Sequence, residues 1–385
     1  MRAFRKVLPV LSFFLIGLIP YSGWAADVAD IAITAGGSTT KYSYRNYSDV
    51  VSAITSTRSI QQLNPSYSPS PASELSINGN LLGTTFTVRS DFQSPTVTVS
   101  VPSCGKTFTR SEGLTRDANF DLVKKDLSNN SSNLQGCLKF PGFDLIVSGE
   151  TTTRNVTNAL NDADSSAGAG AQISSYCIAG YCTNDLLLPL DYAWRLSARD
   201  ALQVEFSIDI PEVEGAHIYG ANIDLLWRHR LTTNWTLQPS VHVGAIGSYD
   251  LATAGAFWSV GLTSIAQFDL PASWRFTLAN ALTYNSSLPI SIAGYNLDNR
   301  VSTAVFRNGV LFSRDLGFRL FGRPVRGNLF AFDTRFAGTA RSPRYFEELG
   351  FTLAVGSRLP AQLGVTYLVG DKSLQGFTVN TGVRF

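Results

Sequence analysis

The chain has 385 residues and a formal net charge of +2, with 16% charged and 44% hydrophobic residues. Residues 1–25, which have the pattern of a cleavable signal peptide described below, hold three basic residues and no acidic one. Their removal leaves 385 − 25 = 360 residues with a charge of 2 − 3 = −1. That length allows two domains, and that charge argues against nucleic acid as a partner. The sequence predicts no cofactor.

The N-terminus has the pattern of a secretory signal peptide. A positive segment precedes the apolar run Val7–Ile19, and small residues, Gly23 and Ala25, stand at positions −3 and −1 of a cleavage site after Ala25. No Cys follows that site, which argues against a lipoprotein. A short membrane anchor is the alternative, but the run is shorter than the ~20 residues that span a bilayer. The basic residues are Arg2, Arg5 and Lys6.

Residues 26–139 are predicted to form a smaller exported domain of mixed or β-rich structure. Short strands are expected at Ile31–Thr34, Thr84–Arg89 and Thr96–Val101, helices at Asp49–Leu63 and Arg116–Leu127, and a loop at Pro65–Pro71. The stretch Tyr42–Tyr47 would suit contact with an unidentified surface ligand such as a sugar, but it is also ordinary strand sequence.

Four Cys residues remain in the exported chain. An even number in an exported protein favours structural disulfides, with a longer loop closed by Cys104–Cys137 and a tight one by Cys177–Cys182. Zinc is the competing interpretation, but the His residues lie far away in the sequence. The Gly, Ala and Ser stretch Ser165–Ala171 is interpreted as a flexible connection.

From Leu190 to the C-terminus, apolar and polar residues alternate with a period of two. Eleven segments follow this pattern, and most have the ~10 residues that a tilted strand needs to cross a bilayer. The segments are 190–197, 202–210, 218–231, 234–246, 256–270, 273–285, 302–314, 328–338, 349–359, 361–370 and 375–385.

Charged residues in the middle of these strands distinguish a membrane barrel from a soluble β-sandwich. Such groups are tolerable in a wet or paired lumen and costly in a sandwich core. Five of the six Trp residues also lie in this region, several at segment ends, where interfacial aromatic girdles are expected. The predicted lumen charges are Glu205, Asp209, Asp224, Arg228, Arg275, Asp333 and Arg335. These residues could line a polar channel or form a network that holds a plug. We favour the simpler interpretation that they are paired charges that stabilise the barrel interior.

The last strand ends on Phe385, with Val383 and other apolar residues alternating before it. This ending resembles the C-terminal signature of outer-membrane barrel proteins, which implies that the barrel-assembly machinery is a partner. The predicted fold is therefore all-β: a transmembrane antiparallel up-and-down barrel of about twelve strands, in the lipid of a Gram-negative outer membrane.

Eleven segments are one strand short of the even number that single-chain bacterial barrels usually have. We expect the twelfth at Gly142–Ser148, so that the barrel begins near residue 140 and residues 150–188 form an outer loop pinned by Cys177–Cys182. The alternative places an extra strand near Leu316–Val325, within Asp315–Gly327, the one long connection among the predicted periplasmic turns.

A C-terminal barrel of about twelve strands behind a separate N-terminal segment resembles the translocator domain of autotransporters. The resemblance covers roughly half of the chain, and the long β-helical repeats of a typical passenger are missing, so a solitary autotransporter-like barrel fits better. It implies that the barrel anchors or displays its own N-terminal region.

Two other functions remain open from the sequence. A narrow channel for small solutes shares the same strand pattern. An outer-membrane hydrolase is disfavoured. A phospholipase of this class has a catalytic Ser two residues after a His, but His242 is followed by Val243 and Gly244. His217 near Glu212 and Glu214 only weakly resembles the acidic and His residues of an outer-membrane protease site. We therefore expect no enzymatic activity.

Overall fold

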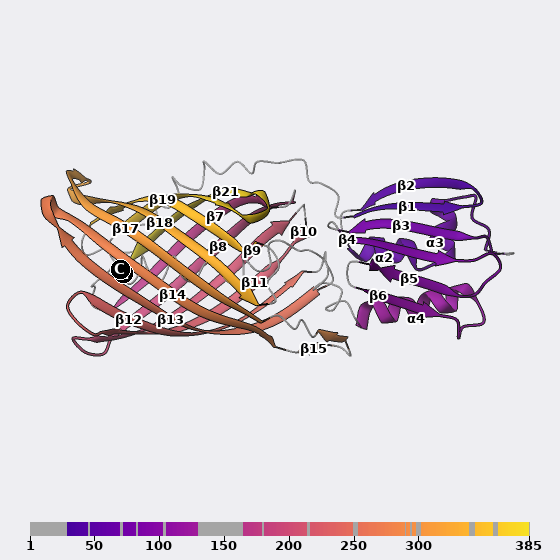
Figure 1. Cartoon of the computed structure of the whole chain (residues 1–385), viewed down its shortest axis with the longest axis horizontal. Coiled ribbons are helices and arrows are strands. Elements are labelled where there is room, and N and C mark those ends of the chain that lie inside the picture. The colour runs from indigo at the N-terminus through magenta and orange to yellow at the C-terminus, as the bar shows by residue number, and fades with distance from the viewer. Residues whose placement is uncertain are drawn as a thin grey trace, which may run out of the picture.

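The computed structural model describes residues 29–129 and 165–384. Short gaps are left at 45–46, 70–71, 82–83, 103–104, 179–180, 214–215, 249–252, 289, 293–294, 298–301, 339–342 and 357–360. The predicted signal peptide, Cys104, Cys137, the proposed strand Gly142–Ser148 and Phe385 all lie outside the described residues. The described chain forms a six-stranded sheet with helices and a separate β-barrel (Figure 1).

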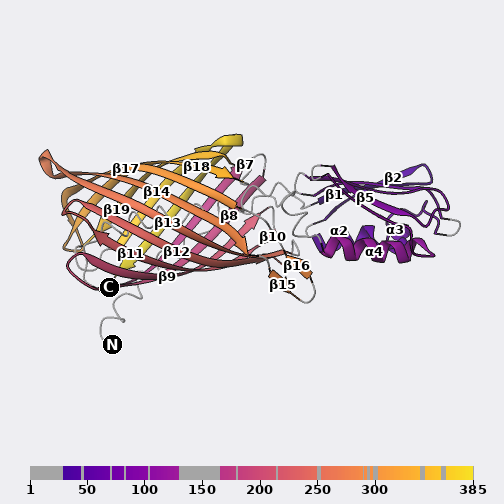
Figure 2. The same ribbon diagram turned by 60° about the horizontal axis from the view of Figure 1, so that its bottom comes forward.

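The N-terminal domain is an antiparallel sheet in the order β2-β1-β3-β4-β5-β6, with its helices on one face (Figure 2). The strands expected from the sequence appear as β1, β4 and β5, and both helical regions are present. The strands are β1 (Ala29–Ala35), β2 (Ser38–Tyr44), β3 (Leu75–Leu81), β4 (Thr84–Ser90), β5 (Val97–Val101) and β6 (Lys106–Arg110). The helices are α2 (Tyr47–Ile54), α3 (Thr57–Leu63) and α4 (Arg116–Asn129).

The core of this domain lies between the sheet and the helices. Strand β1 buries every second residue, Ile31 and Ile33 among them, against α3 and α4 side chains such as Ile60 and Phe120. The Tyr42 hydroxyl donates to the Leu63 carbonyl oxygen, and its ring packs against the same core. Tyr42 therefore behaves as ordinary strand sequence.

A buried arginine fixes the start of α4. Arg116 is 5% exposed and donates hydrogen bonds to the carbonyl oxygens of Ser73, Asp91 and Ser94 and to the Tyr67 hydroxyl, at 2.6–3.1 Å. A buried guanidinium must satisfy its donors, and here neutral acceptors do so. Arg116 thereby ties two loops, the α3–β3 and the β4–β5 connections, to the helix.

The barrel has twelve antiparallel strands and closes on itself through pairing of β21 with β7 and of β8 with β9. All eleven predicted segments are strands. The barrel strands are β7 (Ser166–Ile178), β8 (Tyr181–Arg195), β9 (Asp200–Val213), β11 (Tyr219–Arg230), β12 (Trp235–Ser248), β13 (Thr253–Leu270), β14 (Trp274–Leu288), β17 (Ser302–Leu320), β18 (Arg323–Gly338), β19 (Tyr345–Val355), β20 (Ala361–Gly370) and β21 (Leu374–Arg384). Short strands β10 (Ala216–His217), β15 (Ile290–Ile292) and β16 (Tyr295–Leu297) extend from one end.

The barrel exposes its apolar side chains and covers its polar ones. On β11, Ile223, Leu225 and Trp227 are 46–51% exposed, whereas Asp224 between them is 2% exposed. Alternation along a strand puts successive side chains on opposite faces, so the apolar face points outward and the polar face inward. This is the arrangement expected of a barrel in a bilayer.

Two sequence-based expectations about strand positions were wrong. Segment 190–197 lies in β8, and the strand before it, β7, begins at Ser166. The stretch Ser165–Ala171 is therefore largely strand and not a flexible connection, and residues 181–188 belong to β8 and not to an outer loop. Small outward residues such as Ala167, Ala169 and Ala171 concealed the strand, because they carry little apolar contrast.

The second error concerns the connection Asp315–Gly327. It is neither a long loop nor a separate extra strand: β17 and β18 simply continue into it and meet at a tight turn, Phe321–Gly322. Both turn residues have positive φ, 51° and 76°, which matches the turn type favoured in two-residue hairpins. The turns that the structure fully describes at the end of the barrel near the C-terminus (196–199, 231–234, 271–273 and 321–322) are then short.

The two ends of the barrel differ. The C-terminal strand ends at Arg384, beside the start of β7 at Gly168, so both termini of the barrel lie at one end. The N-terminal domain lies beyond the opposite end, near β10, β15 and β16 (Figures 1 and 2). Helix α4 contacts β16 there. Within the described residues, no helix is long and apolar enough to cross a membrane.

Candidate functional site in the barrel lumen

The inner wall of the barrel is acidic along three neighbouring strands. Asp191, Glu205 and Asp224 are register partners on β8, β9 and β11, and Asp209 lies further along β9 on the same face. Glu205, Asp209 and Asp224 are 1–2% exposed. The structure thus places these three predicted lumen acids on the inward face.

Predicted residue Arg228 joins this wall through a network. Its Nη2 donates to Gln203 Oε1 at 2.7 Å, and Gln203 Nε2 donates to Asp191 Oδ2 at 3.3 Å. Arg384 on the last strand donates from Nη2 to the same Asp191 oxygen at 2.6 Å. The network therefore runs from β11 through β9 and β8 to β21.

Gly168 makes the last link of that network possible. Strand β7 lies between β21 and β8, and Gly168 is the register partner of both Arg384 and Asp191. A Cβ atom at this position would lie 2.1 Å from Asp191 Oδ1, so any larger residue would displace the carboxylate. The ion pair thus crosses the closing strand where the first and last barrel strands meet.

His242 forms a buried pair with Asp224. Its Nδ1 lies 2.6 Å from Asp224 Oδ1, and its ring stacks on Phe257 at 5.2 Å between centroids. Ser259 is the register partner of His242 on β13, but no hydrogen bond between them is present in the described part of the chain. An Asp–His pair without an attached nucleophile orients an imidazole and does not by itself make a catalytic triad.

Arg275, another predicted basic lumen residue, lies at a mouth of the barrel. It follows the β13–β14 turn and its Nε donates to Asp269 Oδ1 at 2.9 Å, with side chains 40% and 79% exposed. Exposed pairs of this kind contribute at most ~1 kcal/mol. Arg275 therefore belongs to the rim and not to the buried network.

Asp333 and Arg335 were wrongly assigned to the lumen. On β18 the inward side chains are Phe330, Phe332 and Thr334, which are 0–5% exposed, whereas the Arg335 side chain is 66% exposed. Asp333 and Arg335 pair with each other at 2.9 Å on the outward face. The assumption that mid-strand charge faces the lumen failed because aromatic rings occupy the inward positions of this strand.

Glycines on neighbouring strands explain the inward aromatic residues. Phe332 is the register partner of Gly309, and Phe330 is that of Gly350. A Cβ at either glycine would lie 2.0–2.1 Å from the ring, so each ring covers its glycine directly. Such pairs fill the lumen beside β17, β18 and β19 with apolar atoms.

A buried ion pair on this side of the lumen was not predicted. Arg307 on β17 and Glu348 on β19 form a hydrogen-bonded salt bridge, with side chains 2% and 11% exposed. The Arg307 guanidinium also lies over the Phe332 ring, 4.9 Å from its centroid. Arg307 and Glu348 follow the alternation of their strands, so the period of two was the signal that could have identified them.

The predicted disulfide and assembly residues have different outcomes. Cys177 and Cys182 are register partners on β7 and β8 and form the expected disulfide at the tip of that hairpin. Val383 is half-buried on β21 and pairs with Ala361 and Ala169. The Cys104–Cys137 pairing and the role of Val383 and Phe385 in assembly stay predictions.

The lumen chemistry is that of a charged, hydrogen-bonded interior. Among the residues that the structure describes, no group of three His, Cys, Asp or Glu side chains could hold a metal ion. The β8–β9–β11 wall presents carboxylates, and the β17–β19 wall presents rings and one ion pair. Such a lumen can hold a polar chain segment by its charges and hydrogen bonds.

Comparisons with known proteins agree at the level of fold. No protein-family model and no curated protein matches the chain. A solved structure similar to it is the β domain of the Bordetella autotransporter BrkA, at 13% identity and a TM-score of 0.47, covering 58% of this chain and 99% of that one. The translocator domain of the autotransporter NalP from Neisseria meningitidis is similar at 13% identity and a TM-score of 0.46, covering 63% of this chain and 97% of that one.

An outer membrane channel from Pseudomonas putida F1 is also similar, at 12% identity and a TM-score of 0.40, covering 58% of this chain and 95% of that one. With identities this low and TM-scores below 0.5, these similarities carry no argument, and the assignment of the barrel rests on its own strand pairing and closure.

Proposed function

We propose that this chain is an autotransporter-like outer-membrane protein whose barrel anchors its own N-terminal domain at the cell surface. The observation that carries the proposal is the position of that domain. It lies beyond the barrel end opposite Arg384, and in outer-membrane barrels the C-terminus and the short turns face the periplasm. The opposite end, with the N-terminal domain, then faces outward.

Contacts at the outer mouth support this arrangement. Buried apolar residues of the N-terminal domain form one cluster with Val213, Ile218, Ile246 and Phe257, which lie at the ends of barrel strands near that mouth. Helix α4 contacts β16 at the same end. A domain seated in this way is held by the barrel as well as tethered to it.

A narrow solute channel is the second candidate, and the lumen lining argues against a wide one. Phe330, Phe332 and the Arg307–Glu348 pair occupy one wall of the lumen, and a twelve-stranded barrel is narrower than the porins of about 16–18 strands that leave an aqueous channel. Single-channel conductance of the refolded chain separates the two functions. A steady open pore in the full-length protein would favour the channel.

The direct test is protease treatment of intact cells. With an epitope inserted at the Gly36–Gly37 turn of the N-terminal domain, we expect proteinase K to remove the epitope from intact cells. Both glycines have positive φ and Gly37 has open space around it, so an insertion there should not disturb the sheet. Full protection of the epitope would overturn surface display.

A second epitope in the barrel provides the control. Inserted at the Phe321–Gly322 turn, it should be protected in intact cells and cleaved only after the outer membrane is permeabilised. If this epitope is removed first and the other is protected, the barrel has the reverse orientation.

A further inference from the structure

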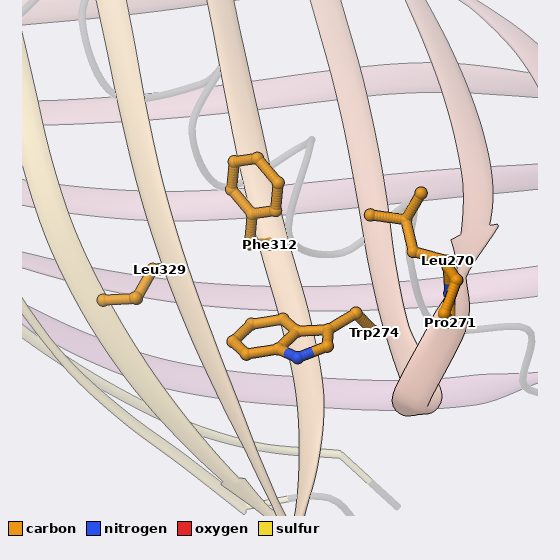
Figure 3. Close-up of a pocket in the computed structure, with 5 residues that line it drawn as sticks. All are labelled: Leu270, Pro271, Trp274, Phe312 and Leu329. Carbon is orange, nitrogen blue, oxygen red and sulfur yellow. The ribbon is translucent and has the colours of Figure 1, made fainter.

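An apolar hollow lies on the outer surface of the barrel, at the end that carries the C-terminus. It measures about 440 Å³ and is lined by Leu270, Pro271, Trp274, Phe312 and Leu329, from the β13–β14 turn across β17 to β18 (Figure 3). Figure 3 shows the Trp274 ring directed from β14 toward Phe312 and Leu329. The volume falls within the ~300–1,000 Å³ of small-molecule sites. All of these side chains are apolar, as an acyl chain requires.

A cation lies at the edge of the hollow. Arg314 is the register partner of Trp274, faces outward, and its guanidinium carbon lies 5.3 Å from the centre of the Trp274 ring. An arginine over an indole face is held in place by cation–π attraction and keeps N–H donors for an anion. The hollow thus combines an apolar floor with a guanidinium group that is held in place to donate hydrogen bonds to a phosphate.

The neighbouring hairpin adds positive charge. Pairing of β14 with β17 ends at Trp274 and Arg314, and the β17–β18 hairpin continues beyond it. Residues 314–326 contain four arginines and one aspartate, a sum of 4 − 1 = +3. Asp315 is already paired with Arg326 at 3.0 Å. An anion at this rim therefore meets an excess of guanidinium groups.

We propose that this hollow binds one anionic phospholipid of the inner leaflet, with an acyl chain along Trp274, Phe312 and Leu329 and the phosphate on Arg314. The charge excess selects an anionic headgroup, and arginine matches phosphate geometry. The position at the C-terminal end selects the periplasmic leaflet, whose lipid is phospholipid. This site is independent of what the N-terminal domain does.

Native mass spectrometry of the full-length refolded chain tests the proposal. The protein is extracted from vesicles that contain phosphatidylglycerol, phosphatidylcholine and lipid A, and the retained lipids are counted. We expect the wild type to retain one phosphatidylglycerol in preference to phosphatidylcholine. Arg314→Gln should lower that retention about tenfold, the factor that corresponds to ~1.4 kcal/mol. Trp274→Ala should lower the retention of both lipids.

Two further variants keep the result interpretable. Arg335→Gln removes an outward arginine from the other end of the same sheet, near the outer rim, and should leave retention unchanged. Arg314→Lys keeps the charge, and it should retain part of the preference even if Arg314→Gln fails to fold. Equal retention of both lipids by the wild type, or an equal loss in Arg335→Gln, would overturn the site. Retention of lipid A through Arg314 would overturn the inner-leaflet assignment.

Discussion

The N-terminal domain and the barrel use the same strand alternation in opposite senses. In β1 the buried residues are apolar, Ile31 and Ile33, and the polar ones face water. In β11 the apolar residues face outward and Asp224 is covered. The period of two is a property of the extended backbone, whereas the medium around the protein decides which face is apolar.

The two regions also stabilise buried arginines differently. Arg116 in the N-terminal domain donates to neutral acceptors, three carbonyl oxygens and a hydroxyl. Arg384 in the barrel is paired with the carboxylate of Asp191, which also accepts from Gln203. A buried full charge that loses its partner is costlier than a buried carbonyl that loses a donor.

The largest expected effect follows from this difference. Arg384→Gln should lower the free energy of unfolding of the barrel by about 3–5 kcal/mol, because the Asp191 carboxylate stays buried without its cation. The double variant Arg384→Gln with Asp191→Asn should recover most of the loss. Urea unfolding followed by Trp fluorescence measures the barrel alone, since residues 26–139 contain no Trp.

The N-terminal domain provides the comparison for this variant. Arg116→Gln leaves no carboxylate behind and should cost less, about 1–3 kcal/mol, with the barrel transition unchanged. If Arg384→Gln cost no more than Arg116→Gln, or if the double variant were no better than the single, the closing ion pair would not be what distinguishes the barrel.

Local alternation was enough to predict eleven of the twelve barrel strands. Each of these segments carries its own contrast of apolar and polar residues, which a single strand needs in order to face lipid on one side. Strand β7 lacks that contrast, because its outward residues near Gly168 are alanines. Its place is fixed by backbone pairing with β21 and β8, which lie about 200 and 20 residues away and are invisible to local pattern.

The candidate site was predictable to a lesser extent. Glu205, Asp209, Asp224 and Arg228 follow directly from alternation. The outward position of Asp333 does not, because it depends on Phe332 covering a glycine of a neighbouring strand. Cross-strand register, which a single sequence does not carry, was the missing information.

A matched pair of substitutions tests the opposite senses of alternation. Leu225 on β11 is 46% exposed and Phe92 in the N-terminal domain is 62% exposed. Leu225→Arg should destabilise the barrel in lipid by about 2–4 kcal/mol, because a charge then faces the hydrocarbon. Phe92→Arg should change the stability of its domain by no more than ~0.5 kcal/mol, because it faces water. Equal effects in urea unfolding from lipid vesicles would contradict the membrane assignment of the β11 face.

The smallest expected effect is a dependence on pH that belongs to the N-terminal domain. Tyr67 is 1% exposed, and burial raises the pKa of its hydroxyl above its ordinary value near 10, although the hydrogen bond from Arg116 opposes the shift. A raised pKa in the folded state gives stability that is fully present below pH 10 and is lost as the pH rises through the folded pKa. Thermal unfolding of the domain, followed by tyrosine circular dichroism, should therefore move to lower temperature above pH 10. Tyr67→Phe should flatten that slope, and an unchanged slope in this variant would assign the loss to other groups.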